Sequence, residues 1–104
     1  MRAVIYARYS SDLQSVSSIE DQIAICRDRA SAEGWSVLET FTDHALSGAT
    51  MNRPGLRALM DAARAGRIDV VLTEALDRLS RDQEDTAAIY KRLTAWQVAL
   101  ATLA

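Results

Sequence analysis

Short apolar runs that suit β-strands alternate along this chain with the apolar stripes of helices, and this alternation is what most constrains the fold. Residues 3–7, 35–41, 68–72 and 98–103 read as strands, with a helical stripe between each pair of successive runs. A strand–helix–strand unit joins parallel strands through a right-handed crossover. The order therefore predicts an α/β fold of three layers, with a mainly parallel sheet and helices on both faces.

The spacing of apolar residues and a glycine at the end predict the first helix. Ile19, Ile23, Cys26 and Ala30 fall at spacings of four, three and four, which is one face of a helix that stops at Gly34.

Two further helices are expected from their end signals. The second has Asn52 as its cap, Pro54 near its start and Gly66 at its end. The third is capped by Ser80 or Asp82.

The composition fits one globular domain, or part of one, of 104 residues. A net charge of −2 argues mildly against a chain whose main task is to grip nucleic acid. The single cysteine, Cys26, excludes an internal disulfide. No apolar run is long enough for a signal peptide or a membrane span, so we expect a soluble, cytoplasmic protein.

Polar segments follow three of the expected strands, at residues 8–11, 43–47 and 77–81. Residues 43–52 have no hydrophobic period and are expected to form a loop. The carboxyl ends of parallel strands share one edge of the sheet. In the expected strand order 2-1-3-4, the first and third of these segments flank the point where the order reverses, and ligands bind at such points.

Arginines dominate these segments. Four of them are expected to converge with no equal run of carboxylates to neutralise them, namely Arg8, Arg53, Arg78 and Arg81. Ser10 or Ser11 would place a hydroxyl opposite their guanidiniums. Fixed positive charges neutralise the non-bridging oxygens of a phosphodiester without a metal. The pattern therefore predicts a phosphoryl-transfer enzyme that acts on DNA.

No cofactor and no metal are expected. One histidine, His44, and one cysteine make no transition-metal site, and no carboxylate cluster has two-metal spacing. No glycine-rich phosphate loop follows the first strand, which disfavours ATP and dinucleotides.

Several motifs stand in order along residues 3–101. They are Tyr6-Ala7-Arg8-Tyr9-Ser10-Ser11, Gln14-Ser15, Ser18 to Gln22, Phe41-Thr42-Asp43, Ser47-Gly48, Arg53-Pro54-Gly55-Leu56 and Leu76-Asp77-Arg78-Leu79-Ser80-Arg81-Asp82. In these residues the chain resembles the catalytic domain of the serine site-specific recombinases, the resolvase/invertase family. The serine-rich segment before Gln22 and the Arg-Pro-Gly-Leu sequence resemble the large-recombinase branch.

The resemblance implies a reaction and a set of catalytic residues. Ser10 would attack a DNA phosphate, displace the 3′ hydroxyl and form a 5′-phosphoserine bond, which stores the energy for religation without ATP. Arg8, Arg78 and Arg81 would bind the scissile phosphate, and Arg53 would assist from the second loop.

Further residues would support the site. Asp77 would hold the neighbouring arginines or take part in proton transfer, and a plain salt bridge to Arg78 or Arg81 is the alternative. The resemblance implies that three residues shape the pocket, Gln22, Asp43 and Ser47. Tyr6 would pack beneath it.

The chain departs from the family at its carboxyl end. The long dimerisation helix and the DNA-binding region are absent, so we expect residues 1–104 to be an incomplete catalytic domain. The parent would act on DNA as a homodimer or tetramer and come from a bacterium, phage or mobile element. This fragment alone is expected neither to bind DNA tightly nor to recombine it.

Two other interpretations stay open. One is a non-catalytic resolvase-like module that serves protein contacts. The other is a flavodoxin-like module that binds a small ligand, for which absorbance in the flavin bands would be diagnostic.

Overall fold

The computed structural model describes residues 1–9, 19–44, 53–80 and 83–103 of the chain. Its elements are β1 (Arg2–Tyr9), α1 (Ile19–Glu33), β2 (Ser36–His44), α2 (Pro54–Arg64), β3 (Val70–Thr73), α3 (Leu76–Leu79), α4 (Gln83–Ala95) and β4 (Ala99–Thr102). No helix in the described ranges has the length and apolar character needed to cross a membrane.

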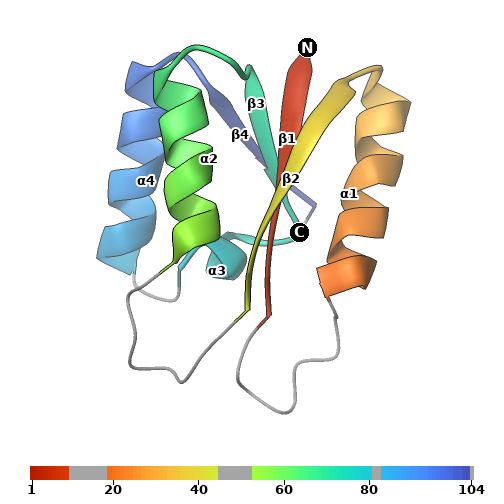
Figure 1. Cartoon of the computed structure of the whole chain (residues 1–104), viewed down its shortest axis with the longest axis horizontal. Helices are drawn as coiled ribbons and strands as arrows, with labels where there is room; N and C mark the ends of the chain where they lie inside the picture. Colours follow the sequence, from red (N-terminus) through yellow and green to blue (C-terminus); the bar gives the residue numbers. More distant parts are fainter. Residues whose placement is uncertain (10–18, 45–52, 81–82, 104) are drawn as a thin grey trace.

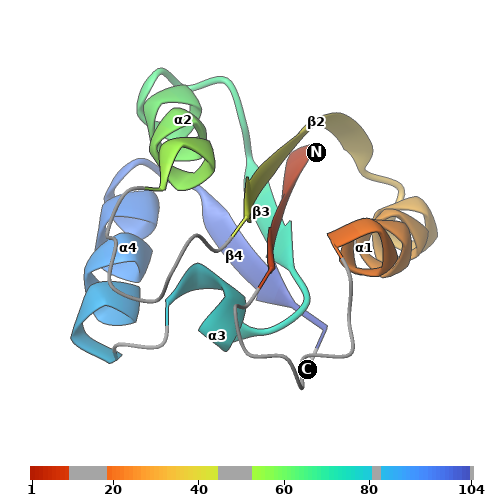
Figure 2. The same ribbon diagram turned by 60° about the horizontal axis from the view of Figure 1, so that its bottom comes forward.

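The strands form one parallel sheet in the order β2-β1-β3-β4, which confirms the predicted α/β fold and strand order. Helix α1 covers one face of this sheet, and α2 and α4 lie side by side on the other (Figure 1). The short helix α3 lies at the carboxyl ends of the strands (Figure 2). The sheet thus presents its carboxyl edge to α3.

The alternating side chains of the central strand β1 build two cores, one on each face of the sheet. Val4 and Tyr6 point to the side of α2 and α4, where they pack with residues such as Leu59 and Leu93. Ile5 points to the other side and packs with Cys26. All of these side chains are buried, and β1 is buried without interruption from Ala3 to Ala7.

Helix α1 buries a different stripe from the predicted one. Cys26 and Ala30 are buried as expected, but the third fully covered residue is the polar Gln22, while Ile23 is only half-buried. Gln22 can lie inside because its amide is hydrogen-bonded, as described below.

Strand β2 is longer than predicted, and the expected loop at residue 43 is wrong. Asp43 and His44 continue the ladder and pair with Arg8 and Tyr9 of β1. The added backbone hydrogen bonds keep this stretch extended although it has no apolar period.

Two other expectations at helix ends are corrected. The N-cap of α2 is Arg53, not Asn52, and Arg53 makes no capping hydrogen bond with its side chain. Helix α3 was not predicted, because a single helical turn is too short to show a period. It places Arg78 in a helix after β3 instead of at the strand end.

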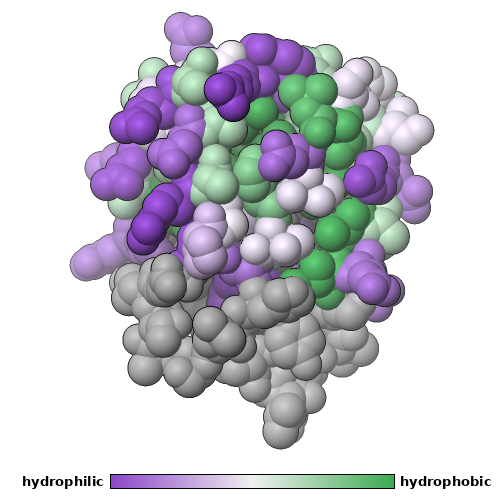
Figure 3. Space-filling view, viewed as in Figure 1, coloured by the Kyte–Doolittle hydropathy of each residue, from purple (hydrophilic) through white to green (hydrophobic). Residues whose placement is uncertain are grey.

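The two sides of the molecule differ in surface character (Figure 3). Hydrophilic residues cover the side of α2 and α4, and hydrophobic residues gather over β2 and α1. Leu38 of β2 and Ile25 of α1 are among the exposed large hydrophobic residues.

Candidate active site

The carboxyl edge of the sheet brings together side chains from four places in the sequence. Arg8 and Asp43 lie one residue before the ends of β1 and β2, Arg53 precedes α2 and Arg78 lies in α3. Among the described arginines, the side chain of Arg8 contacts the backbone of Arg78, whereas Arg53 contacts Tyr6 and Asp85. Three residues of the predicted site, Ser10, Ser47 and Arg81, lie outside the described residues, as does the alternative nucleophile Ser11. Their roles stay predictions.

Arg8 is fixed from two sides. The side-chain amide of Gln22 accepts a hydrogen bond from the Arg8 backbone N–H at 3.2 Å and donates one to the Arg8 carbonyl at 3.1 Å. Gln22 thereby bonds both the N–H and the carbonyl of Arg8, as the backbone of a neighbouring strand would. The Nε of Arg8 donates to the backbone carbonyl of Arg78 at 2.9 Å, which ties the end of β1 to α3. The guanidinium of Arg8 is thus held beside the backbone that carries Arg78.

Arg78 is held by a carboxylate that the sequence reasoning missed. Its Nε and Nη2 both donate to Oε1 of Glu74, at 3.2 and 3.1 Å. The side chains are 14% and 19% exposed, so the pair is largely shielded from water. The sequence signal was the spacing of four residues from Glu74 to Arg78, which brings side chains together across a helical turn. Asp77 lies in α3, and its predicted contacts with arginines stay a prediction.

Asp43 joins the end of β2 to the start of α2. Its Oδ1 accepts the N–H of Gly55 at 2.7 Å, and its Oδ2 accepts the N–H of Leu56 at 2.9 Å. The hydroxyl of Tyr6 donates to Oδ2 at 2.7 Å. Asp43 is only 5% exposed, so these donors replace the water that it loses. It therefore acts as the cap of α2 from a neighbouring strand.

Tyr6 lies fully buried beneath this carboxylate. Burial, followed by the hydrogen bond to Asp43, raises the pKa of the Tyr6 hydroxyl far above its usual value. Tyr6 is therefore a neutral hydrogen-bond donor at physiological pH and not a base.

Arg53 lies over the Tyr6 ring, with its guanidinium carbon 5.9 Å from the ring centroid. Its Nη2 reaches the Tyr6 hydroxyl at 3.5 Å, and its Nη1 pairs with Oδ2 of Asp85 in α4 at 3.4 Å. Within the described chain, the buried Nε of Arg53 has no hydrogen-bond partner. Arg53 thus links β1, α2 and α4.

These pairs correct one expectation. Arg53 and Arg78 do not converge without carboxylates, because Asp85 and Glu74 each neutralise one of them. Neither carboxylate lies in the polar segments that follow the expected strands, at residues 8–11, 43–47 and 77–81. Asp85 comes from the first turn of α4, and Glu74 from the connection between β3 and α3.

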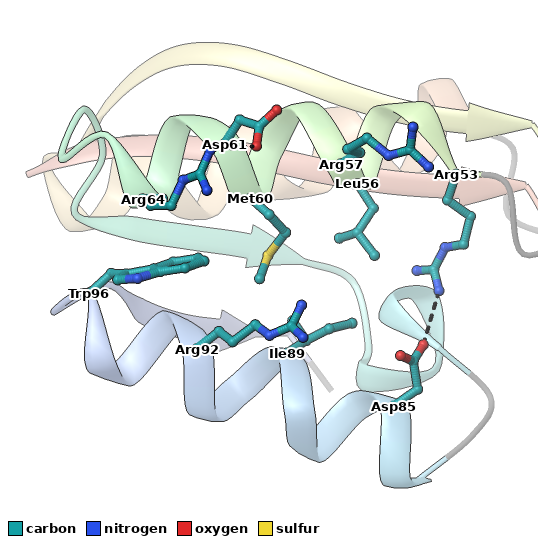
Figure 4. Close-up of a pocket in the computed structure, with 10 residues that line it drawn as sticks. All are labelled: Arg53, Leu56, Arg57, Met60, Asp61, Arg64, Asp85, Ile89, Arg92 and Trp96. Carbon is teal, nitrogen blue, oxygen red and sulfur yellow. Dashed lines mark hydrogen bonds and ion pairs between the residues drawn. The ribbon is translucent and has the colours of Figure 1, made fainter.

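A groove of about 450 Å³ runs between α2 and α4 and has Arg53 and Asp85 at one end (Figure 4). Its lining combines apolar and charged side chains: Leu56, Met60, Ile89, Trp96, Arg57, Asp61, Arg64 and Arg92. The groove follows the helices, whereas Arg8 and Arg78 lie at the carboxyl edge of the sheet. Arg53 lines the groove and also reaches the Tyr6 hydroxyl, which is bonded to Asp43 near the end of β2.

The described residues contain no group of three or more His, Cys, Asp or Glu side chains that could hold a metal ion. The Arg8 guanidinium is hydrogen-bonded to the backbone carbonyl of Arg78, near the end of the strand that leads to Ser10, and the Arg78 guanidinium is oriented by Glu74. Such an arrangement can neutralise a phosphodiester as negative charge develops on its oxygens.

Comparison with known proteins gives consistent matches along nearly the whole chain. The sequence profile of the family described as "Resolvase, N terminal domain" matches residues 3–104. The transposon Tn552 resolvase of Staphylococcus aureus is 33% identical over 88 residues, which are 85% of this chain and 39% of that protein. The chain thus spans about two fifths of the length of this curated relative.

Two solved structures superpose closely. The C-terminal catalytic domain of ISC1926 TnpA, an IS607-like serine recombinase, has a TM-score of 0.87 and 35% identity, and the match covers 100% of this chain and 68% of that one. The N-terminal catalytic domain of TP901-1 integrase has a TM-score of 0.87 and 34% identity, and the match covers 99% of this chain and 77% of that one.

Proposed function

This chain belongs to the resolvase N-terminal domain family, the catalytic domain of serine recombinases, and we propose on that premise that the protein containing it cuts and rejoins DNA. The proposed reaction uses a covalent intermediate. The Ser10 oxygen attacks a backbone phosphorus, the 3′ oxygen leaves with a proton, and a 5′-phosphoserine bond forms. In the reverse step a 3′ hydroxyl attacks this bond and releases Ser10.

The observation that carries the proposal is the hydrogen bond of 2.9 Å between Arg8 and the backbone of Arg78. It fixes the Arg8 guanidinium, two residues before Ser10 in the chain, against the backbone of a second arginine at the carboxyl edge of the sheet. We assign Arg8, Arg78 and Arg81 to the scissile phosphate and Arg53 to an assisting role. Asp77 would hold arginines of the site.

The supporting residues have roles that fit their contacts. Gln22 fixes the backbone of Arg8, and Asp43 fixes the start of α2 just after Arg53. Both act on the position of arginines instead of on the substrate. Ser47 is proposed to border the same pocket.

The proposed substrate is duplex DNA, and the proposed assembly is a dimer or tetramer of the complete protein in the cytoplasm. The similarity to the TP901-1 integrase domain supports the large-recombinase branch. Neither a cofactor nor a metal takes part in the proposed reaction.

Covalent capture tests the proposal. The protein expressed from the complete reading frame that contains this chain, and its Ser10→Ala variant, are incubated with the DNA that flanks the gene. The reactions are quenched in denaturant and digested with nuclease, and peptides are mapped by mass spectrometry. We expect a nucleotide-modified Ser10 that is absent from the variant.

A Ser11→Ala variant is the matched control, because it removes the neighbouring hydroxyl and should keep the adduct. If the DNA is bound and no serine carries a nucleotide, the proposed function is wrong and the non-catalytic interpretation gains.

A further inference from the structure

We propose that Glu74 is a positioning residue that selects which edge of the Arg78 guanidinium faces the DNA phosphate. This inference deepens the proposed function and rests on it. Neither the family match nor the sequence motifs assign a role to Glu74.

The first step is the geometry of the pair. An arginine guanidinium has two forked edges, one made by Nε and Nη2 and the other by Nη1 and Nη2. A single oxygen, Oε1 of Glu74, accepts from both atoms of the first edge, at 3.2 and 3.1 Å. Nη1 and the second hydrogen of Nη2 have no partner in the part of the chain that the structure describes. The fork that remains can bind two phosphate oxygens at once.

The second step is the anchoring of Glu74. Its backbone carbonyl accepts the N–H of Leu103 at 3.2 Å, just after β4, and its side chain is 19% exposed. The backbone of Glu74 is therefore hydrogen-bonded to the residue that follows β4, which anchors its carboxylate. Arg78 is 14% exposed, and its carbonyl holds Arg8 at 2.9 Å. A change at Glu74 would reach Arg78 directly.

The third step is the charge. Without a carboxylate partner, a guanidinium at this edge would bind any phosphate tightly in the ground state. With Glu74 in place, the net positive charge at this edge is lower, but the orientation of the Arg78 guanidinium is fixed. Orientation favours the transition state over the bound substrate, so Glu74 should act on the rate and not on affinity.

The test uses Glu74→Gln, which keeps the shape and removes the charge, in the protein from the complete reading frame. Single-turnover formation of the serine adduct is measured against DNA concentration. We expect the rate at saturating DNA to fall by about 10- to 100-fold, since misplacing a catalytic group by about 1 Å costs up to this much. The half-saturating DNA concentration should stay the same or fall.

The matched control is Glu33→Gln, because Glu33 also pairs with an arginine four residues away, Arg29, at 3.8 Å on the surface of α1. It should change neither value. An unchanged rate in Glu74→Gln, or a loss of rate explained entirely by weaker DNA binding, would overturn the inference.

A second measurement is independent of catalysis. In residues 1–104 with ¹⁵N-labelled arginine, the Nε–H proton of Arg78 should exchange slowly with water and lose this protection in Glu74→Ala. Glu33→Gln should leave it protected. Fast exchange in the unsubstituted chain would contradict the positioning role, whereas absence of a serine adduct in the unsubstituted protein would contradict only the proposed function.

Discussion

At the scale of single residues, Asp43 shows how a buried carboxylate can be both structural and close to a site. Its oxygens receive two backbone N–H groups at the start of α2 and the hydroxyl of Tyr6, and no guanidinium is among these partners. Hydrogen bonds to a charged acceptor are stronger than neutral ones, and a buried acceptor that loses them is costly. The position of Arg53, two residues before Gly55, therefore depends on Asp43.

Asp43→Asn should destabilise the chain more than Tyr6→Phe. The amide replaces one acceptor by an NH₂ group that would face a donor, so we expect a loss of roughly 3 kcal/mol in the free energy of unfolding. Tyr6→Phe removes one donor and leaves the two backbone N–H groups bonded, which should cost roughly 1 to 2 kcal/mol. Urea unfolding followed by circular dichroism measures both. Equal losses would argue against the capping role.

At the scale of elements, α2 is docked closely against β2 through Gly55. A Cβ atom at Gly55 would collide with the backbone carbonyl of Thr42, and it would also come within 3.0 Å of an Asp43 oxygen. Backbone atoms of a paired strand cannot move aside as a flexible side chain can. This close approach lets the Gly55 N–H reach Asp43 at 2.7 Å.

Gly55→Ala should destabilise the chain, although the same change normally favours a helix by about 1 kcal/mol. The collision with Thr42 should reverse the sign and cost roughly 2 kcal/mol or more. Gly66→Ala is the control: Gly66 has φ +77° and open space around it, so only the left-handed backbone is penalised, by about 1 kcal/mol. Thermal unfolding of both variants would show which of the two substitutions destabilises the chain more. A stabilised Gly55→Ala would mean that α2 does not sit this close to β2.

The elements also show what the sequence could predict. The apolar runs at residues 3–7 and 68–72 predicted strands, because side chains on both faces of a parallel sheet are buried and the runs are therefore almost entirely apolar. Helix α3 has a single turn and no period, so nothing local revealed it. The strand at Asp43 could not be predicted either, since its partners are the backbone of β1 and donors at residues 55 and 56.

The candidate site divides in the same way. Arg8 and Arg78 were expected at one edge because parallel strands end together, and this holds. Glu74 was missed, although its spacing to Arg78 was visible, because without α3 there was no reason to expect a helical turn there. The pairing of Arg53 with Asp85 depends on how α2 and α4 pack, which the chain's local pattern does not encode.

At the scale of the whole molecule, one helix layer seals one face of the sheet. Cys26 of α1 is fully buried against this face with Ile5 and Leu72. Burial, with a smaller contribution from the charge of Glu74, raises the pKa of the Cys26 thiol to about 11. The thiol is thus protected as long as the layers stay together.

Stability should therefore fall at alkaline pH. A raised pKa in the folded state means that the contribution is complete below the unfolded value near 8.5 and is lost as pH rises towards 11. We expect a loss on the order of 1 to 2 kcal/mol across this window. Urea unfolding at pH 8 and pH 10.5 measures it. Cys26→Ala should lose less over the same interval, and an equal loss would place its origin at other groups.

The strand order has a consequence for how the chain is made. β1 leaves the ribosome before both of its neighbours in the sheet, β2 and β3, and the second of them begins only at Val70. At about 5 to 20 residues per second, translation separates these partners by several seconds. During that time a nascent chain exposes an apolar strand edge with no native partner. The sheet is then completed only when β3 and β4 have emerged, and Arg8 and Arg78 at its carboxyl edge come into contact only after α3 has emerged.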